Sequence, residues 1–281
     1  MTRTYEIAVV PPFRLDLTVN ALRRLPTNTV DLLTPEGEYV RALFATPRPA
    51  IYRVTQIDHG TLSVRIDGAR SRDDQTLHLV QKVLGTKKDL SGFDKAAGQI
   101  PWLSSLVRRM RGLKPPRYPS LWEACVNAVV FQQLSIRAAS AITRRLIAAL
   151  GERVETDSIP VPLSVFPCAE RLSEATDDTL RATGLSGSKV ATLRRIAEAV
   201  VSGALDAEKL EESTSQDGMA ALCRIKGIGP WTAALILLRG LSRLDVFPAN
   251  DTGAASNIAL FSGDASSDPR LLLDTLGPQR G

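Results

Sequence analysis

The chain of 281 residues contains three cysteines, 5% aromatic residues and no long hydrophobic run. The cysteines (Cys125, Cys168 and Cys223) lie far apart without a Cys-x-x-Cys spacing, so we expect no structural zinc, four-cysteine iron–sulfur cluster or disulfide framework. No apolar stretch approaches the ~20 residues of a membrane-spanning helix, and the apolar run at 7–10 is too short for a signal peptide. With 44% hydrophobic residues, the sequence predicts a soluble, cytosolic globular protein and excludes a disordered chain.

Acidic residues are scarce in two segments, although the net charge is only +5. Residues 99–151 contain eight basic residues against one acid, Glu123, and residues 221–243 contain four basic residues and no acid. Such segments are typical of a phosphate-binding face. The alternative is ordinary solvated helix surface.

The length predicts about two domains at roughly 150 residues each. Residues 1–87 are expected to form an α+β domain, an antiparallel sheet with two helices on one face. The patterns predict strands at 5–10, 38–44, 50–57 and 61–66, and helices at 13–25 and 77–84, the second ending at Gly85. Residues 88–119 are expected to be a connector with a first helical segment. Residues 120–281 are predicted to form an all-helical domain, and whether 88–111 complete its core is left open.

Within the helical part, an apolar stripe from Trp122 to Val130 predicts a helix with one buried face. After a break at 132–134, Ser135 is a good N-cap for a helix at 136–150 that stops at Gly151. Residues 152–169 are rich in proline and predict a loop, and a further amphipathic helix is expected at about 188–201.

The most informative segment is 222–239, which contains Lys-Gly-Ile-Gly-Pro-Trp-Thr-Ala. Gly227 and Gly229 flank one apolar residue, so the chain can turn tightly and present backbone N–H groups. Pro230 suits the first position of the helix that follows. The N-terminus of such a helix can bind a phosphate, and Lys226 and Arg224 add positive charge beside it. The alternative is a plain corner between two helices.

Two further segments support this hypothesis. Asp251 lies 22 residues beyond Gly229 and is expected to open the next helix, where the helix dipole favours a carboxylate. The alternative is an N-cap without a further role.

The second segment, Gln132, Gln133 and Leu134, separates two apolar helices, which suits a protruding tip that inserts into a stack of bases. The alternative is a polar turn.

Together these motifs resemble the helix-hairpin-helix DNA glycosylase superfamily. The hairpin followed by Asp-Val-Phe-Pro-x-x-Asp resembles its phosphate-binding loop and aspartate. Val-Val-Phe-Gln-Gln-Leu-Ser and Gly-Leu-Ser-Gly-Ser-Lys (residues 184–189) are similar to motifs of its alkylated-base branch, 3-methyladenine DNA glycosylase II. The resemblance covers residues 112–281 and implies an all-α helix-hairpin-helix glycosylase core behind the α+β domain.

The resemblance assigns a role to each motif. It implies Asp251 as the catalytic residue, and Trp231 and Leu235 as residues of the base pocket. The implied DNA-binding residues are Gly227, Gly229, Thr232, Lys226, Gln132, Gln133 and Leu134, with Gln133 or Leu134 as the wedge. The backbone carbonyls of Cys223, Ile225 and Ile228 are implied as ligands of a monovalent cation.

The implied activity is that of a monofunctional glycosylase, which flips alkylated purines out of double-stranded DNA and excises them in base excision repair. Relatives with lyase activity carry a lysine where this chain has Trp231, and tryptophan cannot form a Schiff base. No cofactor is expected, with a structural monovalent cation at the hairpin left open. The expected partner is damaged double-stranded DNA, bound by a monomer in the cytoplasm at the nucleoid and not at a membrane.

Two alternatives to this function remain. The chain ends at Gly281, where the resembling proteins continue into a further helix, so one alternative is a shortened, catalytically impaired DNA-binding protein. The other is a helical protein-interaction domain unrelated to DNA.

Overall fold

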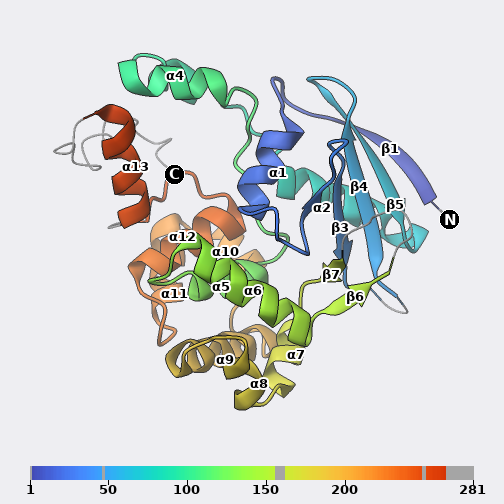
Figure 1. Cartoon of the computed structure of the whole chain (residues 1–281), viewed down its shortest axis with the longest axis vertical. Coiled ribbons are helices and arrows are strands. Elements are labelled where there is room, and N and C mark those ends of the chain that lie inside the picture. Colours follow the sequence, from blue (N-terminus) through green and yellow to red (C-terminus); the bar gives the residue numbers. More distant parts are fainter. Residues whose placement is uncertain (1, 46–47, 156–161, 249–250, 264–281) are drawn as a thin grey trace.

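The structure is a computed structural model that describes residues 2–45, 48–155, 162–248 and 251–263 (Figure 1). Within these ranges, no helix combines the length and the hydrophobicity needed to cross a bilayer. The C-terminal segment at 264–281, on which the shortened-chain alternative depends, lies outside the described residues.

The N-terminal region contains an antiparallel sheet of five strands in the order β1-β5-β4-β3-β2. The strands are β1 (Thr2–Ala8), β2 (Leu32–Leu33), β3 (Tyr39–Leu43), β4 (Ala50–Gln56) and β5 (Thr61–Asp67). In β5, Leu62, Val64 and Ile66 are buried and alternate with more exposed residues, as expected of a strand with one buried face. Strand β2 was not predicted, because two residues are too few to show a period.

Two helices, α1 (Leu15–Arg23) and α2 (Asp73–Leu84), pack against this sheet, and a short 3-10 helix η1 (Arg70–Arg72) precedes α2. Val19 of α1 and Val80 of α2 belong to the same buried cluster as Val64 of β5. Helix α2 ends at Gly85, whose φ of +61° is in the left-handed region that the sequence predicted for this stop.

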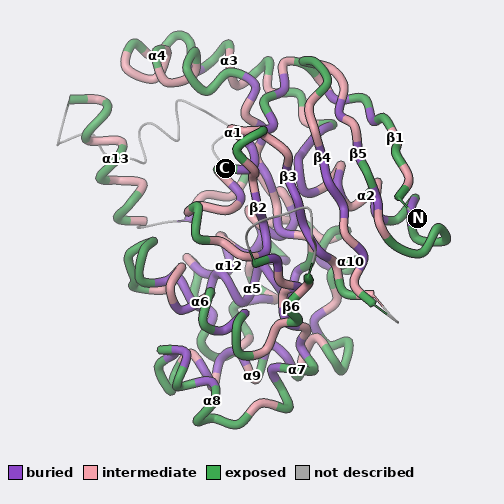
Figure 2. The backbone as a smooth tube through the Cα atoms, turned by 45° about the vertical axis from the view of Figure 1, so that its right-hand side comes forward, coloured by how far each residue is buried: buried purple, intermediate pink, exposed green. Residues whose placement is uncertain are grey.

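The rest of the chain is mostly helical. Its described helices are α3 (Ser91–Ala97), α4 (Pro101–Arg109), α5 (Leu121–Val130), α6 (Ile136–Leu150), α7 (Ala169–Glu174), α8 (Asp177–Ala182), α9 (Gly187–Val201), α10 (Ala207–Glu212), α11 (Ser215–Cys223), α12 (Pro230–Leu241) and α13 (Thr252–Ser262). The predicted helix after Ser135 is observed as α6, and the Ser135 hydroxyl accepts a hydrogen bond from the backbone N–H of Ala138 at 3.2 Å. Helix α4 has no buried residue, and Figure 2 shows it on the outside of the molecule.

The prediction that this part is all-helical is wrong in one place. Between α6 and α7 the expected loop contains two short antiparallel strands, β6 (Glu152–Val154) and β7 (Leu163–Val165). Leu163 and Val165 are buried in a cluster with Leu32 of β2, and the Ser164 N–H donates to the Thr29 carbonyl at 2.8 Å. Contacts with the distant sheet therefore define β7, and three residues give no local pattern that could reveal it.

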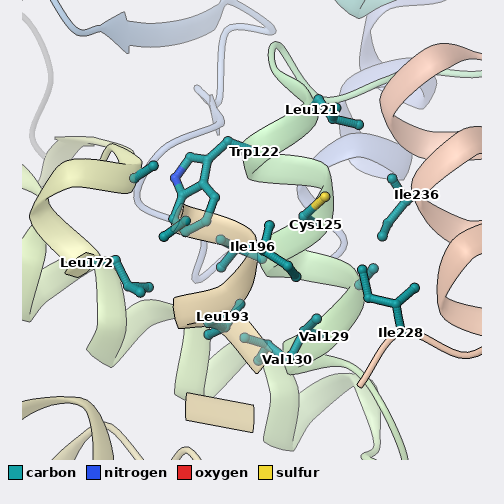
Figure 3. Close-up of a cluster of buried hydrophobic side chains, with 14 of the residues drawn as sticks. Leu121, Trp122, Cys125, Val129, Val130, Leu172, Leu193, Ile196, Ile228 and Ile236 are labelled. Carbon is teal, nitrogen blue, oxygen red and sulfur yellow. The ribbon is translucent and has the colours of Figure 1, made fainter. Parts of the chain in front are cut away.

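Helix α5 forms the centre of the helical part, and all ten of its residues are buried. The sequence predicted one buried face, whereas the structure covers every side of this helix. In Figure 3, Leu193 and Ile196 of α9 and Ile236 of α12 lie around Trp122 and Cys125 of α5. Burial raises the pKa of the Cys125 thiol to about 12, so this thiol is an inert part of the core.

The sheet and α5 meet at a buried ionic cluster. Arg41 of β3 forms ion pairs with Asp31, at 2.6 Å, and with Glu123 of α5. The hydroxyl of Tyr39 donates to Asp31 at 2.7 Å and lies 3.0 Å from the hydroxyl of Tyr52. One cation thus faces two carboxylates, and burial raises the pKa of Glu123 to about 7.

The domain boundary that the sequence analysis proposed near residue 87 stays a prediction.

Candidate DNA-binding surface and active site

Helices α11 and α12 form a hairpin joined by the turn at 224–229. Pro230 is the first residue of α12, as predicted, and Gly229 is its N-cap residue. The first helical bond runs from the Ala233 N–H to the Gly229 carbonyl at 2.9 Å, and no side chain among the described residues caps this end. The backbone N–H groups of the first turn are therefore left for an external acceptor, which suits an anion.

The two glycines of the turn are needed for different reasons. Gly227 has a φ of +104°, and a Cβ there would lie 2.0 Å from the Thr192 hydroxyl, so only glycine fits. Gly229 has nothing within 4 Å of the position of a Cβ, so a ligand can approach the backbone from that side. Gly227 is therefore required by the conformation and packing of the turn, whereas Gly229 leaves the N-terminus of α12 accessible to a ligand.

The remaining residues predicted at the hairpin differ in exposure. Lys226 is exposed, and its carbonyl accepts a hydrogen bond from Arg195 Nη1 at 3.3 Å. Thr232 is buried, and its hydroxyl accepts a hydrogen bond from Gln132 Nε2 at 2.9 Å. A contribution of Thr232 to phosphate binding would therefore come from its backbone N–H, which lies in the first turn of α12.

The tip between α5 and α6 consists of Gln132, Gln133 and Leu134, which differ in exposure and in their contacts. Gln132 turns its amide toward the hairpin, where Nε2 donates to the Gly227 carbonyl at 3.0 Å as well as to Thr232. Gln133 is exposed with a φ of +55°, a strained conformation for a residue with a side chain. Leu134 is also exposed. The exposed residues of the tip are thus the two that were predicted as the wedge.

Asp251 opens α13, as predicted, and both oxygens of its carboxylate are held. Oδ1 accepts the Ala254 N–H at 2.8 Å, and Oδ2 accepts the indole N–H of Trp231 at 2.9 Å. The position at the N-terminus of α13 favours negative charge. The structure therefore brings the predicted catalytic carboxylate and the predicted base-stacking residue into direct contact.

Trp231 and Leu235 lie one turn apart on α12, and both are half-buried against the helical core. Each retains exposed surface beside its buried part. The hydrogen bond to Asp251 uses the edge of the indole ring, so it does not occupy a face on which a base could stack.

Of the three carbonyls predicted for a monovalent cation, those of Ile225 and Ile228 lie in the hairpin turn, and that of Cys223 belongs to the last residue of α11. The Ile225 carbonyl accepts the Ile228 N–H at 3.0 Å, which leaves it a second lone pair for a cation. Neutral backbone oxygens at such a turn fit a hard monovalent ion. Their role as ligands stays a prediction.

Sequence reasoning assigned no role to Lys189, although this residue ends the motif at 184–189. Its ammonium donates to the carbonyls of Val130 and Gln132, each at 2.8 Å, and so reaches the base of the tip. The sequence did contain a sign of this role. Lys189 lies in the first turn of α9, where the helix dipole disfavours a cation, so a lysine at this position indicates a compensating contact. The bond between Trp231 and Asp251, twenty residues apart, had no signal in the sequence.

Known proteins resemble this chain in sequence and in fold. DNA-3-methyladenine glycosylase of Bacillus subtilis is 31% identical over 173 residues, covering 62% of this chain and 56% of the relative. DNA-3-methyladenine glycosylase 1 of Schizosaccharomyces pombe is 33% identical over 165 residues, covering 58% and 65%. The chain thus spans less than two thirds of the length of either relative.

Among solved structures, the 3-methyladenine DNA glycosylase of Archaeoglobus fulgidus superposes with a TM-score of 0.83 at 22% identity, covering 98% of this chain and 94% of the other. This likeness shows that the two chains share their fold. Residues 126–269, which contain the tip, the hairpin and Asp251, match the HhH-GPD superfamily of base excision DNA repair proteins. The chain therefore belongs to the HhH-GPD superfamily.

Proposed function

We propose that this protein is a monofunctional DNA glycosylase that excises alkylated purines of the 3-methyladenine type from double-stranded DNA. The observation that carries the proposal is the contact between Trp231 and Asp251, one an aromatic residue and the other a carboxylate at a helix N-terminus. The names of the two curated relatives support the same class of substrate. The proposal includes action as a monomer on DNA in the cytoplasm, at the nucleoid.

The exposed tip and the hairpin would act first on the DNA. A base inside a duplex cannot be attacked, and flipping it out costs a few kcal/mol of unstacking. Gln133 and Leu134 are exposed and would fill the gap that the base leaves. The open N-terminus of α12, with Lys226 beside it, would hold a phosphate of the backbone.

The bond cleavage follows from the charge of the substrate. An N-alkylated purine is cationic and leaves as a neutral base, so it needs little acid catalysis. Stacking on Trp231 adds a cation–π attraction of about 1–2 kcal/mol when the pair is desolvated. Asp251 would stabilise the positive charge that develops on the sugar and orient water, as carboxylates do in glycoside hydrolysis. The cation predicted at the hairpin would organise the turn and takes no part in this step.

The lack of an AP-lyase activity also belongs to the proposal. Trp231 has no amine to attack the sugar, and Lys226 lies in the turn, five residues before it. Incubation with DNA that contains an abasic site should leave the strand intact until alkali is added. Cleavage without alkali, trapped as a covalent adduct by borohydride, would contradict this part.

Asp251→Asn tests the proposal directly. We expect this variant to keep its affinity for DNA and to lose release of 3-methyladenine from methylated duplex DNA by at least about 100-fold, since a transition-state charge loses its partner. Asp178→Asn, at an exposed aspartate in the first turn of α8, is the matched control and should release the base like the unchanged protein. Full activity in Asp251→Asn would refute the catalytic assignment, and DNA binding by the unchanged protein without release would favour the binding protein without turnover.

A further inference from the structure

One side of α9 contacts both parts of the proposed DNA-binding surface. Lys189, Thr192 and Arg195 follow one another at intervals of three, which places them along one side of the helix. Lys189 binds the base of the tip, and Arg195 binds the Lys226 carbonyl in the hairpin turn. Thr192 lies between them and abuts Gly227 so closely that no side chain fits there.

The tip and the hairpin are also linked to each other directly. Gln132 Nε2 bonds to the Gly227 carbonyl and the Thr232 hydroxyl. The Gln132 carbonyl in turn accepts the ammonium of Lys189. Tip, hairpin and α9 thus form a closed ring of contacts, and Gln132 belongs to that ring rather than to the exposed end of the tip.

Lys189 is the charged residue of the ring that contacts the tip. Its ammonium lies at the C-terminal end of α5, where Val130 is the last residue and a cation is favourable. In the part of the chain that the structure describes, Lys189 forms no ion pair, so its described polar partners are carbonyls of the tip. Burial lowers the pKa of the ammonium, which nevertheless makes two hydrogen bonds of 2.8 Å.

We propose that Lys189 is a positioning residue, which holds Gln133 and Leu134 at a fixed place relative to the phosphate-binding hairpin. The wedge then enters the duplex at a set distance from the phosphate that α12 binds, so that backbone binding and base flipping occur together. Lys189 touches neither the substrate base nor the sugar in this role and acts through the tip. The inference rests on the proposed function.

Lys189→Met tests this role, because methionine keeps an unbranched stem and removes the three N–H donors. We expect the thermal midpoint and the affinity for undamaged duplex to change little, within about threefold for the affinity, because the hairpin keeps its own N–H groups. We expect kcat for release of 3-methyladenine to fall by about 10- to 100-fold, because a shift of about 1 Å in a positioned group can cost about 100-fold. The KM should stay nearly constant. Loss of folded protein would also lower the apparent kcat at constant KM, so the unchanged thermal midpoint and DNA affinity distinguish the positioning role from a general loss of folded protein.

Three further variants make the test decisive. Lys189→Arg keeps the charge and should recover a large part of the lost rate. Lys209→Met, on an exposed lysine of α10, should have no effect. Gln132→Met breaks the ring from the other side, and combining it with Lys189→Met should cost much less than the product of the two single effects, because both disturb the same tip.

The outcomes separate this inference from the proposed function. Lack of base release by the unchanged protein refutes the proposed function and the inference with it. Release by the unchanged protein and equal release by Lys189→Met overturns the positioning role alone. If Lys189→Met does not fold, Lys189→Gln decides, because its shorter, uncharged side chain also removes the ammonium, and an unchanged kcat in that variant likewise overturns the role.

Discussion

At the scale of single residues, the site depends on pairs whose chemistry is simple and whose partners are far apart in the chain. Trp231 donates its N–H to Asp251 and has a ring on which we propose that the base stacks, so one side chain would have two separable functions. Asp251 is likewise both the cap of α13 and the proposed charge partner of the sugar. The N-cap role that the sequence offered as an alternative is therefore present, and it orients the carboxylate in a way that is compatible with the proposed catalytic role.

Substitutions of Trp231 should separate its two functions. Trp231→Phe keeps a stacking face and removes the bond to Asp251, so excision of 3-methyladenine and of neutral hypoxanthine should fall alike, by about tenfold for one hydrogen bond to a charged group. Trp231→Ala should reduce excision of the charged lesion most, because the cation–π attraction is lost. Single-turnover rates on both lesions measure this, with Trp102→Phe on α4 as the control. An equal loss on both lesions in Trp231→Ala would contradict the stacking role.

At the scale of elements, the local sequence predicted several helix ends correctly. For the end of α6, however, the structure gives a different reason from the one predicted. Ser135, Pro230 and Asp251 begin helices where their side chains predicted. Gly151 ends α6 as predicted, yet its backbone is extended, with a φ of −79°. A Cβ there would lie 2.5 Å from the Val165 carbonyl, so packing against β7 requires this glycine.

The hairpin glycines give a prediction at this scale. Gly227→Ala should lower the stability by about 1–3 kcal/mol, because its positive φ and the contact with Thr192 both oppose a side chain. Gly229→Ala should leave stability nearly unchanged and weaken DNA binding, because its methyl group would occupy the open approach to α12. Denaturant unfolding measures the stability of both variants, and DNA titration measures their affinity for DNA. Each variant is the control for the other. Equal stability losses would show that the two glycines do not differ in role.

At the scale of the whole molecule, the sheet and the helical core are joined by charge as well as by apolar packing. The cluster of Arg41, Asp31 and Glu123 lies where β3 meets α5, the helix that leads directly into the tip. Breaking a buried ion pair by removal of one partner is costly, because the remaining charge is uncompensated. We therefore expect the placement of the tip to depend on the N-terminal sheet as well as on α9.

This cluster predicts a pH dependence of stability. The carboxyl of Glu123 has a pKa of about 7 in the folded protein and an ordinary value of 4.5, because burial disfavours its charged form. Between these values the folded state binds more protons than the unfolded state, so stability should fall as pH rises from about 4.5 to 7, by at most about 3 kcal/mol. Glu123→Gln should flatten this part of the profile, whereas Glu36→Gln, on an exposed loop residue, should not. Unfolding measured by denaturant at several pH values checks the slope, and a rise of stability over this range would contradict the assignment.

The sequence by itself determined the helix-hairpin-helix, the caps around it and four of the five N-terminal strands, because caps, turns and periodic burial act over a few neighbouring residues. The resemblance in these motifs was enough to identify the family. Only the tertiary structure decided the partners of Gln132, Lys189 and Arg41 and the pairing of β6 with β7. These contacts join residues that are distant in the chain, and their geometry depends on how whole elements pack, which no local pattern encodes.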